Sequence, residues 1–547
     1  LCRSQCTNEP RMAQPTSSFL SKTFVRFRSV TVSCTSIVRE YPAFSFTRYP
    51  TVLFRTRMST PTRSYEDAIA ALNQLQTNAS DLTTPVAVHK SLIHTREWAA
   101  RVGLRGQDLN ALKAIHVAGT KGKGSTCVMT EALLRSQGLK TGLFTSPHLI
   151  AARERIRING TPLSKEMFAK YFFDTWDALK QNAPPSSNMP SMPPYFRFLT
   201  IMSFKVFLAE AVDVAVIEVG LGGTWDSTNI IDKPVVCGIT SLGLDHVSVL
   251  GNTIEEIAAA KAGIFKTGVP AITMPQYDAA YDVLKQCATK TETPLMLSPD
   301  FGKYEYDVLD LKLGIAGVHQ KVNASLALQL VKVWTLQNKT NVEEKTLPPL
   351  QTAPDGVQNL LPTFALTQAQ THALQHCRCP GRSQVETYRG MTWYLDGAHT
   401  VESCEACSAW FADVSNIKDV VANTTKKVLI FNCTHARDPK PLLARFNNID
   451  FDVAIFTVAS SNAVNKNADQ DNRTVAPIET LERSQHCKHI YEEQSGIKDT
   501  KSKQANSKQA EFIPHVEDVM SYLETYKAKH GCEVQVLVTG SLHLIGA

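Results

Sequence analysis

A glycine-rich segment, HVAGTKGKGST at residues 116–126, contains the residue types that bind phosphate groups in proteins. Its glycines let a backbone approach an anion closely, and Lys123 can reach the outer phosphates of a nucleotide as a point charge. A helix that begins at Ser125 or Thr126 would add free N–H groups and the positive end of its dipole. The residues that we expect to contact a nucleotide here are Gly119, Thr120, Lys121, Gly122, Lys123, Gly124 and Ser125.

This segment is not a regular Walker A loop. Val117 stands at the position of the first glycine, and Gly124 separates the lysine from Ser125. The alternative interpretation is a tight turn with a solvated lysine. The order of apolar strand, glycine-rich loop and helix favours a phosphate loop.

Three polar residues near the ends of other strand candidates could hold a metal ion. Ser146 follows an apolar run at 141–145, Glu218 ends the run DVAVIEV, and His246 follows a run at 235–240. A buried carboxylate near phosphate is costly unless it meets a cation. The carboxyl ends of parallel strands line the crevice where such sheets bind ligands. Each residue alone also has a structural interpretation, as a turn cap, an ion pair with lysine or a packed histidine.

The elements that must position these residues alternate between short apolar runs and amphipathic stretches. Strands are expected at residues 114–118, 141–145, 213–219, 235–240 and 269–273, and helices at 65–75, 125–137 and 254–266. A second set of strand candidates lies at 392–395, 427–432, 453–458 and 534–539. The pattern predicts an α/β protein with parallel sheets in two domains, the second of them smaller.

We expect these domains at residues 61–377 and 378–547. Two polar stretches, 338–362 and 460–510, contain few apolar residues. Because such segments cannot bury enough apolar surface to order themselves, we expect surface insertions, with disorder at about 460–510.

The first 60 residues differ in composition from the rest of the chain. They are rich in Ser and Thr and hold nine Lys or Arg residues against two acidic ones. This composition is typical of an organelle transit peptide and indicates a mitochondrial location. A disordered tail or a mistranslated leader is the alternative, and Met58 could start a cytoplasmic form.

The net charge of +6 therefore comes from this leader, and the nearly neutral body gives no reason to expect a nucleic-acid partner. No run of about 18 apolar residues is present, so no membrane span is expected. The 13 scattered cysteines indicate reduced thiols rather than a disulfide framework. Neither Cys377-x-Cys379 nor Cys404-x-x-Cys407 has a second ligand pair at zinc-finger spacing.

A series of segments in one order resembles folylpolyglutamate synthase of the eukaryotic type, in the Mur-ligase-like superfamily. The resemblance runs from residue 64 to the end of the chain. It rests on HVAGTKGKGST, LFTSPHL, RERIRINGTPL, AVIEVGLGGTWDSTN, LGLDHVSVLG, AAKAGIFK, CPGRSQ, YLDGAH and LVTGSLHL. It implies a P-loop Rossmann-like ATPase domain followed by a smaller C-terminal α/β Mur-ligase-type domain. We expect a monomer.

The resemblance also implies a reaction. ATP would phosphorylate the terminal γ-carboxylate of a tetrahydrofolate (poly)glutamate, and the amine of L-glutamate would attack the acyl phosphate. The implied cofactors are ATP and Mg²⁺, together with a monovalent cation, K⁺. This activity would retain folates for one-carbon metabolism.

By the same resemblance, Ser146, Glu218 and His246 match the family's metal ligands. Lys261 matches a lysine that family members often carry as a carbamate; a cation near phosphate is its other interpretation. The remaining matches are Arg382 as a phosphate-contacting arginine, Asp396 as a nucleotide-binding aspartate, His399 beside it as a catalytic residue, and Asn323 near the adenine. Cys379 departs from the family pattern, which has tryptophan there, but Arg382 is kept.

Two other functions remain open from the sequence. Dihydrofolate synthase, or a bifunctional enzyme, would use the same chemistry on dihydropteroate. A regulatory nucleotide-binding module would keep the loop but would need none of Glu218, His246, Arg382 and Asp396. The presence of this whole set argues against the module.

Overall fold

The computed structural model describes residues 63–76, 85–184, 189–308, 311–338, 349–351, 359–416, 425–433, 437–458, 477–497 and 508–547. The expected leader at 1–60 lies outside these residues. Pro61–Ala547 is one compact unit, and it contains two β-sheets.

The first sheet has eight strands in the order β4-β3-β2-β5-β1-β6-β7-β8. The strands from β2 to β8 in this order are parallel, and β3 and β4 add an antiparallel hairpin at one edge. The strands are β1 (Ile115–Ala118), β2 (Thr141–Phe144), β3 (Ile156–Ile158), β4 (Thr161–Pro162), β5 (Val214–Glu218), β6 (Val236–Ile239), β7 (Ala271–Thr273) and β8 (Leu295–Leu297).

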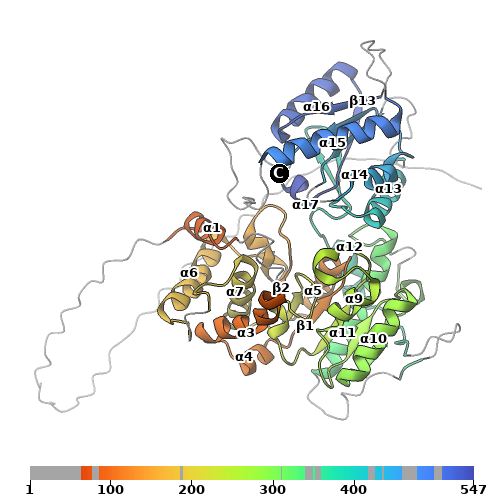
Figure 1. Cartoon of the computed structure of the whole chain (residues 1–547). Helices are drawn as coiled ribbons and strands as arrows, with labels where there is room; N and C mark the ends of the chain where they lie inside the picture. The colour runs from red at the N-terminus through yellow and green to blue at the C-terminus, as the bar shows by residue number, and fades with distance from the viewer. Residues whose placement is uncertain are drawn as a thin grey trace, which may run out of the picture. The chain divides into compact units, whose positions relative to one another are not determined.

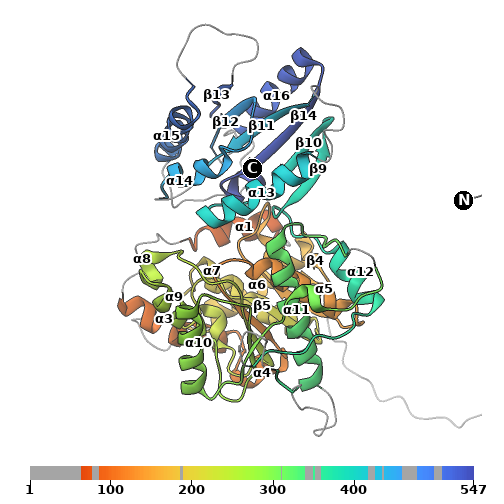
Figure 2. The ribbon, with the colours of Figure 1, turned by 90° about the vertical axis from the view of Figure 1, so that its right-hand side faces the viewer.

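Helices cover both faces of this sheet (Figures 1 and 2). Alternate side chains of β1 enter different cores, because Ile115 and Val117 pack with α5 and α11, whereas Ala118 packs with α9 and α10. The helices of this part are α1 (Tyr65–Asn73), α3 (Pro85–Arg101), α4 (Gly106–Ala111), α5 (Lys123–Arg135), α6 (Lys165–Gln181), α7 (Tyr195–Ala209), α8 (Val247–Leu250), α9 (Ile254–Ala262), α10 (Asp278–Thr291), α11 (Val318–Gln337) and α12 (Gln368–His376).

The second sheet has six strands in the order β13-β12-β11-β14-β10-β9. All neighbours are parallel except β9, which pairs antiparallel with β10 at the edge. The strands are β9 (Gln384–Tyr388), β10 (Met391–Leu395), β11 (Thr425–Phe431), β12 (Val453–Phe456), β13 (Gln509–Phe512) and β14 (Glu533–Thr539). This sheet also lies between two apolar cores, one with α13, α14 and α15 and the other with α16 and α17. These helices are α13 (Val401–Asn416), α14 (Pro439–Leu443), α15 (Pro477–Ser495), α16 (Val516–His530) and α17 (Leu542–Gly546).

The predicted α/β class with two parallel-rich sheets is confirmed, and every predicted strand is present to within two residues at each end. The helix expected at 125–137 begins and ends two residues earlier, as α5. Among the described residues, no helix is long and apolar enough to cross a membrane.

The expectation of a disordered stretch at 460–510 is wrong for residues 477–495, which form α15. The helix is polar on average, but a narrow face with Ser484, Cys487, Ile490 and Tyr491 is buried against the second sheet. The other residues between 459 and 507, apart from the end of this helix, lie outside the described part. In the polar stretch at 338–362, the described residues include a β-bridge between Gln351 and Leu360.

Candidate nucleotide and acyl-transfer site

The glycine-rich segment connects β1 to α5, as predicted. Gly122 has φ of 87°, a left-handed conformation that lets the chain turn directly into the helix. Gly119 has φ of 150°, and a Cβ there would lie 1.8 Å from Oγ1 of Thr240. The loop is closed on its other side by Ser241, whose carbonyl accepts the N–H groups of Thr120 and Lys121. The loop therefore brings backbone to the N-terminus of α5, where an anion finds free N–H donors.

Two lysines converge on this loop. Nζ of Lys123 donates to the carbonyls of Gly119 at 3.1 Å and Thr120 at 3.3 Å. Nζ of Lys261, from the last turn of α9, donates to the same Gly119 carbonyl at 2.8 Å. Burial, aided by the charge of Lys123, lowers the pKa of Lys261 to about 7. Near pH 7 Lys261 is therefore only partly protonated, and both amines lie on the loop where the phosphates of a nucleotide would bind.

Glu218 and Ser146 are brought together beside the same helix terminus. The Glu218 carboxylate is buried, and its Oε2 accepts the N–H of Ser146 at 2.9 Å. A Cβ at Gly124 would lie 3.6 Å from both carboxylate oxygens, so Glu218 faces the first turn of α5. Burial raises the pKa of Glu218, although Lys123 and the Ser146 N–H act against it. A buried carboxylate and a hydroxyl residue are oxygen donors of the kind that Mg²⁺ prefers, so these two residues fit the ion.

His246 is not joined to Glu218 or Ser146 by a hydrogen bond or ion pair. It has left-handed backbone geometry, with φ of 53°, directly before α8, and its N–H donates to the Asp245 carboxylate at 3.0 Å. In the part of the chain that the structure describes, no three His, Cys, Asp or Glu side chains form a cluster able to hold a metal ion. Its role as a metal ligand stays a prediction.

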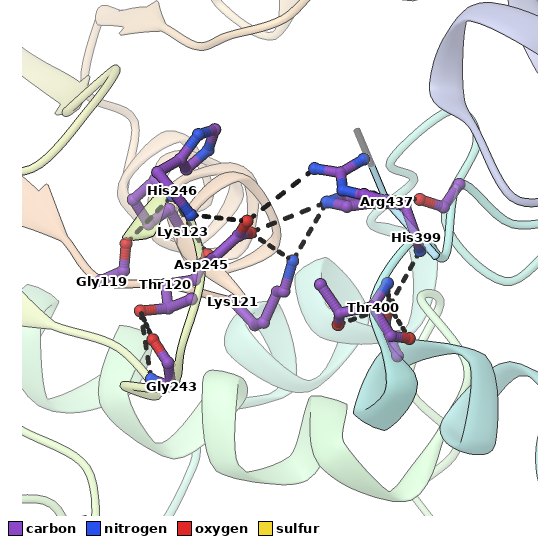
Figure 3. A network of polar contacts seen from close by, with 12 residues as sticks. Gly119, Thr120, Lys121, Lys123, Gly243, Asp245, His246, His399, Thr400 and Arg437 are labelled. Carbon is purple, nitrogen blue, oxygen red and sulfur yellow. Dashed lines mark hydrogen bonds and ion pairs between the residues drawn. The ribbon is translucent and has the colours of Figure 1, made fainter. Parts of the chain in front are cut away.

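Asp245 is the centre of a polar network that links loops of the two sheets (Figure 3). Its Oδ2 accepts a hydrogen bond from Nζ of Lys121 at 2.8 Å, and its Oδ1 lies 3.8 Å from Nη2 of Arg437. Lys121 also lies 3.0 Å from Nε2 of His399, the histidine of the LDGAH segment. Burial alone would raise the pKa of Asp245, but the charge and hydrogen bond of Lys121 outweigh it, so the pKa is lowered.

His399 is a neutral hydrogen-bond acceptor in this arrangement. Burial and the charge of Lys121 lower its pKa to about 3. Its Nδ1 lies 2.8 Å from the carbonyl of Gly397, which can only accept, so Nδ1 carries the proton and donates. Nε2 therefore presents its lone pair to Nζ of Lys121. The ring is fixed in one tautomer and cannot act as a proton donor through Nε2 at neutral pH.

Arg382 and Asp396 lie on adjacent turns at one end of the second sheet. The Asp396 carboxylate accepts the N–H of Ser383 at 2.8 Å and thereby holds the turn that carries Arg382. The positive charge of Arg382 acts electrostatically on Glu218 and Lys121, in the direction that lowers the pKa of each. Asn323, in α11, packs against the phosphate loop, because a Cβ at Gly122 would lie 2.3 Å from its Oδ1. Its position relative to an adenine stays a prediction.

Two arginines of this region were not predicted from the sequence as site residues. Arg437 follows β11 with no motif of its own, and only the structure brings it to Asp245. Arg155, within RERIRING, donates from Nε to Nδ1 of His148 at 2.9 Å and lies over the Tyr195 ring at 5.5 Å. Among the described residues, its two terminal nitrogens meet no acceptor. The clustering of arginines in that segment was the signal that could have found it.

Comparisons with known proteins agree with this architecture. The mitochondrial folylpolyglutamate synthase of Bos taurus is 46% identical over 444 residues, which cover 79% of this chain and 76% of the relative. The folylpolyglutamate synthase of Saccharomyces cerevisiae (strain RM11-1a) is 37% identical over 507 residues, which cover 88% and 86%. The structure of Mycobacterium tuberculosis folylpolyglutamate synthase complexed with ADP and AMPPCP has the same fold, with a TM-score of 0.64 at 22% identity, covering 88% of this chain and 97% of that one. No family model matches the chain.

The two sheets and the phosphate loop define a nucleotide-binding α/β protein with a second α/β region whose turns approach the loop. Within that class, the identity and coverage of the bovine and yeast relatives are decisive. The chain belongs to the folylpolyglutamate synthase family.

Proposed function

We propose that this chain is an ATP-dependent ligase that adds L-glutamate to the terminal γ-carboxylate of tetrahydrofolate (poly)glutamates. The observation that carries the proposal is the convergence of Lys123, Lys261 and the Glu218–Ser146 pair on the N-terminal turn of α5. The assignment of folate and glutamate as substrates rests on the bovine and yeast relatives, which are named folylpolyglutamate synthase.

The chemistry follows from the charges of the site. A carboxylate is a poor electrophile, and transfer of the γ-phosphoryl group of ATP gives it a good leaving group. The α-amine of glutamate then attacks the carbonyl carbon, and the tetrahedral intermediate collapses to a γ-amide and inorganic phosphate. Phosphoryl transfer depends on positioning and on neutralising the phosphate oxygens. Lys123 and the N–H groups of the first turn of α5 provide these donors.

Ser146, Glu218 and His246 would hold Mg²⁺, which supplies charge neutralisation and a template for the phosphates when it is bound. Ser146 and Glu218 meet the demand for oxygen ligands, and the raised pKa of the buried Glu218 indicates a carboxylate that a cation would stabilise. A monovalent cation, K⁺, is a further expectation. Mg²⁺-dependent quenching of a fluorescent nucleotide, lost in Glu218→Gln, would test the ion without turnover.

Residues of the second sheet complete the proposed nucleotide site. Arg382 contacts phosphate, and Asp396 holds its turn through Ser383. The Lys121–His399 contact keeps the LDGAH segment against the loop. We propose Lys123, Lys261 and His399 as catalytic residues, with His399 acting as a neutral acceptor rather than as an acid.

Three further expectations concern the whole chain. We propose a monomer, a mitochondrial location by analogy with the bovine relative, and a cytoplasmic form that starts at Met58. We also propose a domain boundary near residue 377, and the start of the second sheet at β9 (Gln384–Tyr388) supports this proposal.

The direct test is glutamate-dependent release of ADP with tetrahydrofolate, together with mass analysis of the folate product. We expect Lys123→Ala to lower kcat about 100-fold or more, because one preorganised charge-stabilising donor contributes about that factor. Lys290→Ala, an exposed lysine of α10, is the matched control and should leave kcat unchanged. Activity with dihydropteroate alone would refute the proposed substrate and indicate dihydrofolate synthase.

A further inference from the structure

Two cysteines of the second sheet region have their sulfur atoms in contact. Cys433 follows β11, and Cys487 lies in α15. Their Sγ atoms are 3.6 Å apart, both side chains are fully buried, and both thiols are free. A disulfide has its sulfur atoms about 2.0 Å apart, so a displacement of about 1.5 Å would bring these two to bonding distance. We propose that Cys433 and Cys487 are a redox-active pair that a hydroperoxide converts to a reversible disulfide between β11 and α15.

The surrounding contacts hold the two sulfur atoms in place. Ser484 lies one helical turn before Cys487 on α15, and its hydroxyl donates to the carbonyl of Thr457 at 2.8 Å. The same hydroxyl accepts a hydrogen bond from Nδ2 of Asn432, the neighbour of Cys433, at 3.0 Å. These buried bonds fix α15 to the ends of β11 and β12 directly beside the pair. The fold therefore holds the two thiols in contact before any oxidation.

The two thiols are not equivalent. The hydrogen bond between the two sulfur atoms, in which either can donate, lowers the pKa of Cys433 against the effect of burial, and the Arg483 guanidinium acts in the same direction. The same hydrogen bond and burial raise the pKa of Cys487. Since the thiolate is the nucleophile, Cys433 reacts first and Cys487 is the resolving thiol.

The reaction balances with a hydroperoxide as the oxidant. The Cys433 thiol loses its proton, the thiolate attacks one peroxide oxygen, and the O–O bond breaks. The leaving oxygen takes up that proton and departs as water or an alcohol, and Cys433 becomes a sulfenic acid. The Cys487 sulfur then attacks the sulfenic sulfur, the S–O bond breaks, and the hydroxide leaves as water with the Cys487 proton. A dithiol reverses the bond by exchange. Because both thiols are buried, hydrogen peroxide should react where bulky alkylating reagents do not.

The pair is linked to the phosphate loop by short polar steps. Nη1 of Arg483, in α15, donates to the carbonyl of Arg437 at 3.3 Å. The Arg437 side chain approaches the Asp245 carboxylate, which in turn accepts the hydrogen bond from Lys121 of the loop. Drawing α15 towards Cys433 therefore acts on Arg437 through the hydrogen bond from Arg483. We expect the disulfide to lower turnover several-fold; this readout rests on the proposed function, whereas formation of the bond does not.

The test is peroxide treatment of the reduced full chain followed by tryptic peptide mapping. Trypsin should place each cysteine alone in a short peptide, VLIFNCTHAR at 428–437 and SQHCK at 484–488. The expected result is a linked pair of these two peptides together with lowered turnover. Dithiothreitol should then separate the two peptides and restore the turnover. Cys487→Ser should abolish the linked peptide and the reversible loss. Cys404→Ser, a buried cysteine of the same apolar core, is the control that should retain both.

The wild-type chain alone keeps the proposal falsifiable, whatever the variants do to folding. Absence of the linked peptide at peroxide levels that oxidise the less buried Cys287 and Cys532 would overturn it. A linked peptide with unchanged turnover would overturn the connection to the phosphate loop. A chain without ligase activity would remove only the turnover readout, because the peptide map is independent of the reaction.

Discussion

Lys261 shows at the scale of one residue how the site uses burial. Its pKa of about 7 lies well below the ordinary value of 10.5, first because of burial and then because of Lys123. Below pH 7 the folded chain must keep a buried ammonium, and this cost shrinks as the pH rises from about 7 towards 10.5. The neutral amine that forms in this range is also the species that could become a carbamate.

Lys261→Met should therefore change stability in a pH-dependent way. Methionine fills similar space without a charge, so the variant escapes the cost of the buried ammonium. We expect the midpoint of thermal unfolding of the variant, relative to wild type, to be higher at pH 6 than at pH 9. Differential scanning fluorimetry at both values measures this, with exposed Lys290→Met as the control. An equal difference at both pH values would contradict the lowered pKa.

Arg155 is the second residue whose environment predicts a role. Its Nε is held by His148, its terminal nitrogens meet no acceptor among the described residues, and its charge lowers the pKa of the nearby Glu218. An arginine fixed in this way presents two parallel N–H donors that match a carboxylate. We expect Arg155→Gln to raise KM for the folate acceptor about 10- to 100-fold, the range for a lost hydrogen bond to a charged group.

Nucleotide affinity separates this role from damage to the fold. Arg155→Gln should bind ADP as wild type does, and Arg157→Gln, two residues further along the chain in β3, should keep the wild-type KM for folate. The Arg157 Nε donates to the Glu154 carbonyl, so that residue is already occupied. A parallel loss of ADP binding in Arg155→Gln would assign Arg155 to the nucleotide instead.

At the scale of elements, the β1–loop–α5 unit depends on glycines for two different reasons. Gly119 is required for its φ of 150° and because a Cβ at this position would clash with the side chain of Thr240. Gly138, after α5, has φ of 82°, and a Cβ there would have nothing within 4 Å of it. Alanine at Gly138 should cost about 1–2 kcal/mol of stability from backbone strain alone. Alanine at Gly119 adds a clash and should also abolish ADP binding, which calorimetry would measure; retained ADP binding would show that the loop can reshape.

The sequence was sufficient for this unit but not for all elements. Strands β1, β2 and β5 are continuous apolar runs, so burial on both faces of the sheet was visible in their composition. The β3–β4 hairpin was missed although Asn159-Gly160 is a strong turn signal, with φ of 50° and 76° in the structure. Helix α15 was missed because only a narrow face is buried, and the average polarity of its segment hid that face.

The site could be predicted only where its residues belong to motifs. Glu218 and Ser146 were expected at strand ends, and parallel pairing of β2 with β5 brings them together. The contact between Lys121 and His399 joins segments from different sheets, and local periodicity contains no information about such a pairing. The same holds for Arg437 and Asp245. Tertiary placement of loops, rather than secondary structure, was what the sequence alone left open.

At the scale of the whole molecule, the charge is unevenly divided between two regions. Residues 1–60 contain nine basic and two acidic residues, whereas the remaining 487 residues of Pro61–Ala547 are nearly neutral. A basic, acid-poor leader is read by its charge during import into mitochondria. Among the residues that the structure describes, those of the candidate site lie between Gly119 and Arg437, so we expect the ligase chemistry to need no part of the leader.

We therefore expect location and activity to be separable. Residues 1–60 fused to a fluorescent protein should direct it to mitochondria, and replacing the leader's Lys and Arg residues by Gln should leave it in the cytoplasm. A chain that starts at Met58 should stay in the cytoplasm and keep the kcat of the full chain, because the described residues of the candidate site all follow Met58. Fluorescence microscopy and the ADP-release assay measure the two properties independently. A fall in kcat on removal of the leader would contradict this separation and would show that the leader contributes to the ligase activity.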